Sequence, residues 1–180
     1  MKNKKLLLDI KEYLKCYEDQ VLEDWYELIR HISVSETGEG IETCCDWIQK
    51  KMEEIGIQVT KYSVKPAPVL VGRFGNDPEK KTVLIYAHYD VKPAGERKLW
   101  HSDPFVPTVR DGKVYARGSA DNKSPLMAHL KALEYFIRRK MEVPVNVIFV
   151  FEGDEECGSR RIGGISGRAQ DGIGSGSGVF

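Results

Sequence analysis

The sequence predicts an α/β fold in which amphipathic helices alternate with apolar strands. Apolar residues recur at intervals of three and four over residues 4–31, which is typical of helix. Residues 82–87 and 145–151 are short apolar runs, which are typical of strands buried in a sheet. Helical patterns interleaved with such strands favour an α/β sandwich.

Three helices are expected along the chain. Residues 4–31 predict one helix, or two separated by a break. A polar connection, residues 33–38, leads to a second amphipathic helix that is expected to end at Gly56, because glycine is common just after a helix. The third helix is expected from Pro125 to about Lys140, with apolar residues along one face.

The strands are bounded by turn-forming residues. Residues 57–64 and 69–74 predict two strands, separated by the turn-prone 66–68 with its two prolines. The runs 82–87 and 145–151 suit strands that are buried on both faces. The segment 91–117 is expected to be mostly loop, with a short hairpin around Asp111 and Gly112.

Composition excludes several classes of protein. Lys plus Arg and Asp plus Glu both total 27, so a formal charge of zero gives no reason to expect nucleic acid or an acidic membrane surface as partner. A start resembling a secretory signal is interrupted at once by Asp9, Lys11 and Glu12, and no run has transmembrane length. The four cysteines show neither CxxC spacing nor a disulfide framework, which predicts a reduced, cytoplasmic protein.

His88 and Asp90 form the first candidate site. They lie two residues apart at the end of a predicted strand, so their side chains point to the same side, toward the crevice where open α/β sheets bind ligands. The imidazole can bind a metal ion, and a nearby carboxylate can fix its tautomer. The alternative is a surface loop that merely contains His and Asp.

Two acidic candidates follow. Asp121 lies where a loop enters a helix; it is either a carboxylate that bridges two cations or a helix N-cap. Glu155 and Glu156 follow the strand 145–151, so they can reach the same crevice, one as ligand and one as general base. With Glu152 and Asp154 nearby they would repel one another unless a cation or solvent relieves them, and a solvated acidic loop is the alternative.

Several blocks of residues together resemble the M20 family of metallopeptidases. The matching blocks are residues 84–91, Trp100 with 103–105, residues 111–123 and residues 152–159. The resemblance covers residues from about 20 to 160. Within the family, the matching blocks are most similar to the dipeptidase branch. It implies an α/β three-layer sandwich around a mainly parallel sheet, as in zinc peptidases.

The resemblance also implies roles for five residues. His88 would bind one metal ion, Asp121 would bridge two, and Glu156 would bind the second. Asp90 would orient His88, and Glu155 would be the general base that takes a proton from the bridging water. The implied cofactors are two divalent ions, zinc first, with manganese or cobalt as alternatives. The implied substrates are dipeptides or N-acyl amino acids, and the peptide bond between Asp121 and the next residue is expected to be cis.

The sequence departs from the family pattern after these blocks. Family members carry a further Asp ligand, a distant His ligand and a lid and dimerisation domain through which they are often homodimers. The only later acid here is Asp171. We therefore expect residues 1–160 to be the N-terminal part of a catalytic domain, incomplete and lacking the lid. Residues 161–180 form a glycine-rich atypical tail, either out of frame or genuine.

Three hypotheses follow for the chain. The first is a truncated hydrolase that is inactive alone. The second is a non-catalytic metal-binding or regulatory fragment. The third is a fragment of marginal stability, in which an exposed strand edge favours aggregation.

Overall fold

The computed structural model describes residues 2–160, 162 and 163. Its elements, in chain order, are α1 (Lys2–Arg30), α2 (Ile41–Glu54), β1 (Gln58–Tyr62), β2 (Val69–Phe74), β3 (Thr82–His88), the 3-10 helix η1 (Arg97–Leu99), β4 (Thr108–Arg110), β5 (Lys113–Tyr115), α3 (Lys123–Arg138), β6 (Asn146–Glu152) and the 3-10 helix η2 (Glu155–Cys157). The predicted helices, strands and hairpin are confirmed, and α1 is one continuous helix. The predicted glycine-rich tail lies outside the described residues, apart from 162 and 163.

A four-stranded sheet with the order β1-β2-β6-β3 forms the centre of the described chain. The pairs β1–β2 and β2–β6 are antiparallel, whereas β3–β6 is parallel. The short connection between β1 and β2 permits only an antiparallel pair, while the long crossover that contains α3 permits a parallel one. The α/β class is confirmed, and the sheet is mixed where the sequence predicted a mainly parallel one.

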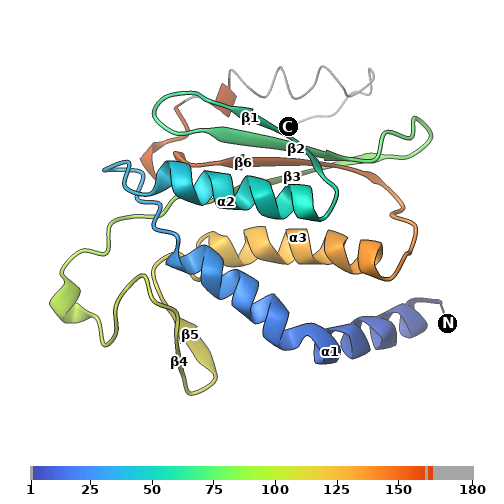
Figure 1. Cartoon of the computed structure of the whole chain (residues 1–180), viewed down its shortest axis with the longest axis horizontal. Helices are drawn as coiled ribbons and strands as arrows, with labels where there is room; N and C mark the ends of the chain where they lie inside the picture. Colours follow the sequence, from blue (N-terminus) through green and yellow to red (C-terminus); the bar gives the residue numbers. More distant parts are fainter. Residues whose placement is uncertain (1, 161, 164–180) are drawn as a thin grey trace.

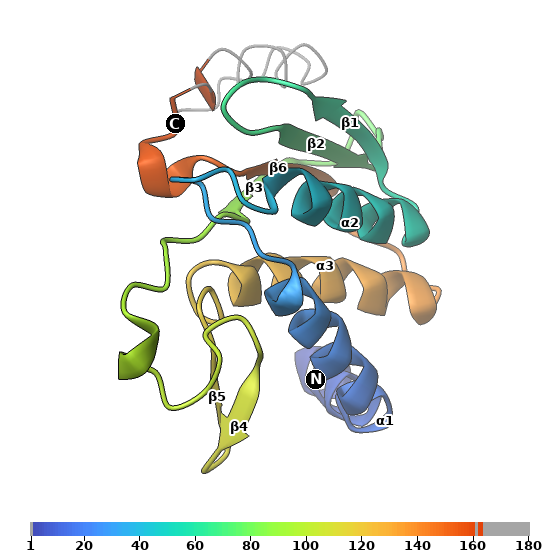
Figure 2. The same cartoon turned by 60° about the vertical axis from the view of Figure 1, so that its left-hand side comes forward.

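The α-helices α1, α2 and α3 lie on one side of the sheet (Figure 1). Helices α2 and α3 lie next to the strands, and α1 packs outside them, so the described layers run from sheet to inner helices to α1. Figure 2 shows the same order from a second direction, with the β4–β5 hairpin projecting away from the sheet. The described residues thus supply a helical layer on one face of the sheet, which agrees with the predicted, incomplete α/β sandwich.

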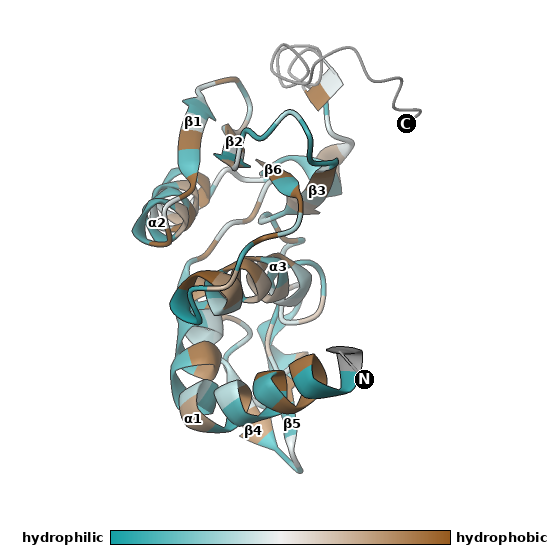
Figure 3. Cartoon of the chain, turned by 90° about the vertical axis from the view of Figure 1, so that its right-hand side faces the viewer, coloured by the Kyte–Doolittle hydropathy of each residue, from teal (hydrophilic) through white to brown (hydrophobic). Residues whose placement is uncertain are grey.

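The main core fills the space between the sheet and the two inner helices. Alternate residues of β2 and β6 belong to one core cluster with the periodic apolar positions of α2 and α3. Figure 3 shows how hydrophobic and hydrophilic residues alternate along these helices. The fully buried members include Leu70, Phe149 and Phe151 from strands, with Ile48 and Leu126 from helices. At roughly 2 kcal/mol for each large apolar side chain removed from water, this layer supplies the principal stabilisation of the sheet.

Strand β3 corrects one prediction. The sequence suggested that residues 82–87 are buried on both faces, but Val83, Leu84 and Tyr86 are 42%, 37% and 44% exposed. The physical reason is that β3 lies at the edge of the described sheet, with β6 as its neighbour on one side. Strand β6 lies between two strands, and every residue of it is buried, as predicted. An apolar run therefore identified both strands but not which one lies inside.

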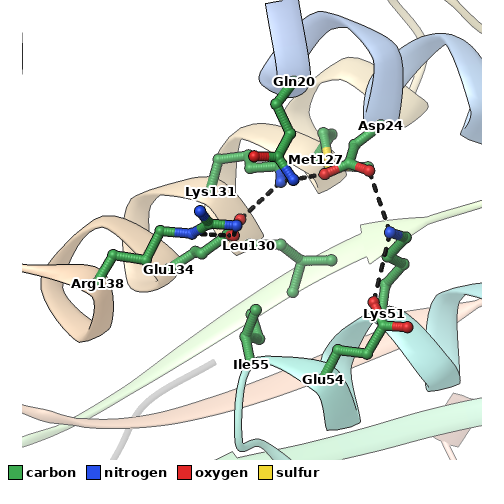
Figure 4. A pocket seen from close by; sticks show the side chains of 10 residues that line it. All are labelled: Gln20, Asp24, Lys51, Glu54, Ile55, Met127, Leu130, Lys131, Glu134 and Arg138. Carbon is green, nitrogen blue, oxygen red and sulfur yellow. Dashed lines mark hydrogen bonds and ion pairs between the residues drawn. The ribbon is translucent and has the colours of Figure 1, made fainter. Parts of the chain in front are cut away.

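A charged cluster joins the three helices (Figure 4). The ammonium of Lys131 on α3 pairs with Asp24 on α1 and lies 2.6 Å from the carboxylate of Glu134. Asp24 also accepts from Lys51 on α2 at 3.1 Å, and Arg138 pairs with Glu134 at 2.6 Å. Burial alone would raise the pKa of Asp24, but the two lysines outweigh it and the pKa is lowered. These pairs attach α1 to the rest of the fold.

Two further findings concern the environment of the chain. None of the described helices combines the length and the apolar content that crossing a membrane requires. The side chains of all four cysteines are free thiols, and Cys44 and Cys45 are buried side by side in α2. Burial raises the pKa of Cys45 to about 12, so that thiol stays protonated and unreactive at neutral pH.

We predict that Lys131→Met lowers the free energy of unfolding by about 2 kcal/mol at neutral pH, because it removes the ammonium shared by the half-buried Asp24 and the buried Glu134. The depressed pKa of Asp24 means that its stabilisation exists above its unfolded-state pKa and is lost as the pH falls through the folded-state pKa. The effect of the substitution should therefore shrink in acid. Urea denaturation from pH 3 to 7 measures it.

The matched control is Lys50→Met. This lysine is 75% exposed and lies 3.8 Å from Glu54, so we expect a change below about 0.5 kcal/mol. Equal losses in the two variants would contradict the assigned role of Lys131.

Candidate active site

Three segments that are distant in the sequence meet at one edge of the sheet. His88 ends β3 and pairs in register with Glu152 at the end of β6. Because β3 and β6 are parallel, their carboxyl ends open at the same edge, and the loops that follow them lie together. The third segment is the loop before α3, which carries Asp121. The predicted convergence of the histidine with the acidic residues is therefore observed.

The imidazole of His88 lies between carboxylates from the other two segments. Its Nε2 is 3.1 Å from Oδ1 of Asp121 and 3.7 Å from Oε2 of Glu155. Its Nδ1 is 3.2 Å from the backbone oxygen of Asp90 and 3.4 Å from the carboxylate of the same residue. With Nδ1 donating to Asp90, Nε2 is the ring nitrogen directed at the acidic groups.

Asp90 is fully buried and organises this edge. Its carboxylate accepts backbone N–H groups from Glu155 at 3.2 Å and Glu156 at 3.0 Å. Burial alone would raise the pKa of Asp90, but hydrogen bonds from His88, Ser35 and the Glu156 backbone outweigh burial and lower it. Asp90 therefore stays ionised and holds both the imidazole and the loop after β6.

The imidazole is a stronger base than an ordinary histidine. Burial would lower the pKa of His88, but the hydrogen bond to Asp90 and the negative charges of Asp90 and Glu155 raise it to about 9. At neutral pH the ring therefore carries a proton and a positive charge. That cation satisfies carboxylates that would otherwise repel one another.

Asp121 comes from a tight loop. Gly118 has a φ of 78°, and a Cβ there would lie 2.5 Å from Cγ1 of Val91, so only glycine fits against the β3 segment. The peptide bond between Asp121 and Asn122 is cis, as the resemblance implied. The side chain of Asp121 is 76% exposed, and its position beside His88 is set by the loop. Oδ1 of Asn122 is buried, with no hydrogen-bond partner among the described residues.

The acidic run after β6 is divided among different partners. Glu152 is buried and accepts from the hydroxyls of Tyr86 at 2.6 Å and Ser159 at 2.8 Å; burial raises its pKa. Asp154 pairs with Arg160 at 2.6 Å. Separate protein groups thus relieve the predicted repulsion within the acidic run. The carboxylates of Glu152 and Asp154 are held by these groups and not by the imidazole of His88.

Glu156 is the predicted site residue that lies apart. Its carboxylate is 3.7 Å from the ammonium of Lys92, which also donates to the backbone oxygen of Glu156. Across the described residues, no group of three or more His, Cys, Asp or Glu side chains has an arrangement suited to a metal ion. The structure brings Asp121 and Glu155 to Nε2 of His88, with Asp90 on the Nδ1 side of the ring, and it turns Glu156 toward Lys92.

Sequence reasoning missed one buried charge near the site. Lys123 is fully buried at the start of α3, and its ammonium donates to the backbone oxygens of Leu28 at 3.1 Å and His31 at 2.6 Å. Burial lowers the pKa of this lysine. The signal was present in the sequence, because a lysine directly follows the predicted loop and precedes an apolar helix face.

Comparison with known proteins identifies the family. Residues 84–175 match the model of Peptidase family M20/M25/M40, and this range includes all five predicted site residues. The chain belongs to this family. The two relatives and the solved structure described next are dipeptidases, which agrees with the branch that the sequence suggested.

Two relatives and one solved structure illustrate the similarity. The chain is 43% identical over 113 residues to the Cys-Gly metallodipeptidase dug1 of Schizosaccharomyces pombe, covering 61% of this chain and 24% of that protein. It is 32% identical over 162 residues to the cysteinylglycine-S-conjugate dipeptidase of Corynebacterium striatum, covering 88% and 35%. The crystal structure of human carnosine dipeptidase 1 superposes with a TM-score of 0.83 at 28% identity, covering 92% and 39%. The chain therefore spans about a quarter to two fifths of these proteins.

We predict that Asp90→Asn moves the pKa of His88 from about 9 down toward its ordinary value, about 6.5, because the carboxylate that stabilises the imidazolium is lost. A raised folded-state pKa stabilises the fold fully below the unfolded-state pKa, and that stabilisation is lost as the pH rises through about 9. The variant should lose this dependence. NMR titration of the ring in the chelator-treated chain measures both pKa values.

Asp103→Asn provides the control, because that carboxylate is exposed and pairs with Arg97 away from the site. A His88 pKa that is the same in the Asp90 variant and the unaltered chain would contradict the role given to Asp90.

Proposed function

We propose that this chain forms part of the active site of a metal-dependent hydrolase that cleaves the amide bond of dipeptides. The observation that carries the proposal is the approach of Asp121 and Glu155 to Nε2 of His88, while Nδ1 of the same ring faces the buried Asp90. An imidazole whose Nδ1 is held by a backbone oxygen and whose Nε2 faces carboxylates provides the types of donor atom that catalytic divalent cations take.

The substrate class is proposed from the relatives. The matched proteins are named for Cys-Gly, Cys-Gly conjugates and β-Ala-His, all of which are small dipeptides. N-acyl amino acids are the second substrate class, because the similarity extends to a succinyl-diaminopimelate desuccinylase at 35% identity. We propose a cytoplasmic location, which fits the four free thiols.

The proposed roles follow the sequence expectations. His88 and Asp121 would hold one cation, Asp121 would also contribute to a second, and Glu156 would hold the second in place of its contact with Lys92. Asp90 keeps the imidazole in the tautomer that presents Nε2. Bound zinc, or manganese or cobalt in its place, would act as a Lewis acid at the scissile carbonyl. Glu155 takes a proton from the attacking water and delivers it to the leaving amine, as a carboxylate placed beside the reacting centre can do.

The described residues supply only part of such a site. Catalytic zinc usually has three protein ligands, so two ions need more donors than His88, Asp121 and Glu156 provide. We therefore propose that residues 1–160 are the N-terminal part of a catalytic domain whose other ligands come from elsewhere. For the 180 residues by themselves we expect no dipeptide hydrolysis above a chelated control.

A non-catalytic metal-binding fragment is the second candidate. It requires only the pair formed by His88 and Asp121, whose Nε2 and Oδ1 lie 3.1 Å apart, and no further catalytic group. It differs from the first proposal in one respect, because it requires His88-dependent metal binding without any contribution to turnover.

A chimera tests the proposed function. The part of this chain that aligns with the Corynebacterium dipeptidase would replace the matching region of that enzyme, and the rest of that enzyme would be kept. We predict hydrolysis of Cys-Gly conjugates that stops when metal is chelated. The intact Corynebacterium enzyme is the positive control. A chimera that folds and binds metal but does not cleave would favour the non-catalytic candidate.

In that chimera, we predict that Glu155→Gln lowers kcat by roughly 10³-fold while metal content is unchanged, because the amide cannot take the proton. Glu156→Gln should instead reduce the metal content. Turnover and metal analysis by mass spectrometry measure both effects, with the exposed Glu79→Gln as control. If Glu155→Gln lost metal together with activity, the division of labour between the two glutamates would be wrong.

A further inference from the structure

The carboxylate of Asp121 is placed by its backbone rather than by its own contacts. It is 76% exposed, and in the described part of the chain its polar contact is with Nε2 of His88. A side chain this exposed gains little from packing, so the loop that carries it must be held by other residues. That loop runs from Gly118 to Lys123, whose N–H donates to the oxygen of Gly118 at 3.2 Å.

Lys123 attaches the loop to the end of α1. Its ammonium is fully buried and donates to the oxygens of Leu28 and His31, at 3.1 Å and 2.6 Å. These oxygens belong to the last turn of α1 and the residue after it, where helix carbonyls lack partners and the helix dipole is negative. The helix dipole stabilises a buried cation at that place, and the ammonium donates hydrogen bonds to both carbonyl oxygens.

The residues that follow α1 also contact the other two segments of the site. The hydroxyl of Ser33 donates to the oxygen of Tyr89 at 2.6 Å, and the oxygen of Ser33 accepts from the N–H of Val91 at 2.8 Å. The thiol of Cys157 donates to the hydroxyl of Ser35 at 3.5 Å. The residues after α1 therefore touch the segments that carry His88 and Glu155, and Lys123 adds the segment that carries Asp121.

We propose that Lys123 is a positioning residue for the metal site: its ammonium, seated on the carbonyl end of α1, holds the Asp121 carboxylate in reach of the imidazole of His88. This inference rests on the proposed function, because it assumes that His88 and Asp121 bind the same cation. It gives α1, which contributes no ligand, a direct part in forming the site.

The test compares two lysines of α3 in the full 180-residue chain, the fully buried Lys123 and the half-buried Lys131. Lys123→Met removes the ammonium at the α1 end, and Lys131→Met removes the one in the ion-pair cluster with Asp24. Cobalt(II) is titrated into each folded variant, and affinity and the d–d absorption spectrum are recorded. We expect Lys123→Met to weaken cobalt binding roughly 10–100-fold and to change the spectrum. Lys131→Met should leave both as in the unaltered chain.

Two further variants keep the outcomes distinct. His88→Ala tests whether cobalt binds at this site. If this variant binds cobalt as tightly as the unaltered chain does, both the proposed function and this inference are wrong. His88-dependent binding that is equal in Lys123→Met and the unaltered chain would overturn the inference alone. If Lys123→Met does not fold, Lys123→Gln retains an N–H donor and should bind cobalt with intermediate affinity. Gly118→Ala should disturb the same loop, because a Cβ there would lie 2.5 Å from Val91. If Lys123→Gln and Gly118→Ala both bind cobalt as tightly as the unaltered chain, the inference is also wrong.

Discussion

The site depends on one buried anion. The carboxylate of Asp90 has no exposure to water and accepts the N–H groups of Glu155 and Glu156. A buried charge is tolerated only when hydrogen bonds or an opposite charge replace its hydration, and Asp90 has both, because the imidazolium of His88 lies beside it. The ends of β3 and β6 are therefore tied together before any cation binds.

In this arrangement the protonated imidazole of His88 supplies the positive charge that a divalent metal ion would otherwise supply. With a pKa of about 9, His88 supplies the positive charge between Asp121 and Glu155 that a divalent ion would supply more strongly. Glu156 finds its positive charge at Lys92 instead. Metal binding at this edge would thus compete with a proton on His88 and with an ammonium at Glu156, and the affinity should fall as the pH falls.

Helix α1 links stability to the site, although it is the outermost layer. Its middle is attached to α2 and α3 through Asp24, and its end accepts the ammonium of Lys123. The first contact involves half-buried charges and the second a fully buried one, and each would be destabilising without its partners. A helix that sequence periodicity describes only as amphipathic therefore carries two specific electrostatic attachments.

The sequence by itself determined the local elements and the identity of the chemical groups. Periodicity identified α1, α2, α3, β2 and β6, because side-chain spacing reports which face of an element avoids water. The matching blocks identified the family and singled out His88, Asp90, Asp121, Glu155 and Glu156.

The tertiary structure decided which partner each group has. It placed β3 at a sheet edge, divided the acidic run among Tyr86, Arg160, His88 and Lys92, and buried Lys123 at the end of α1. These results depend on strand order and on contacts between residues that are far apart along the chain. Local spacing does not encode such contacts, since the energy of a buried charge is set by whatever the fold brings beside it.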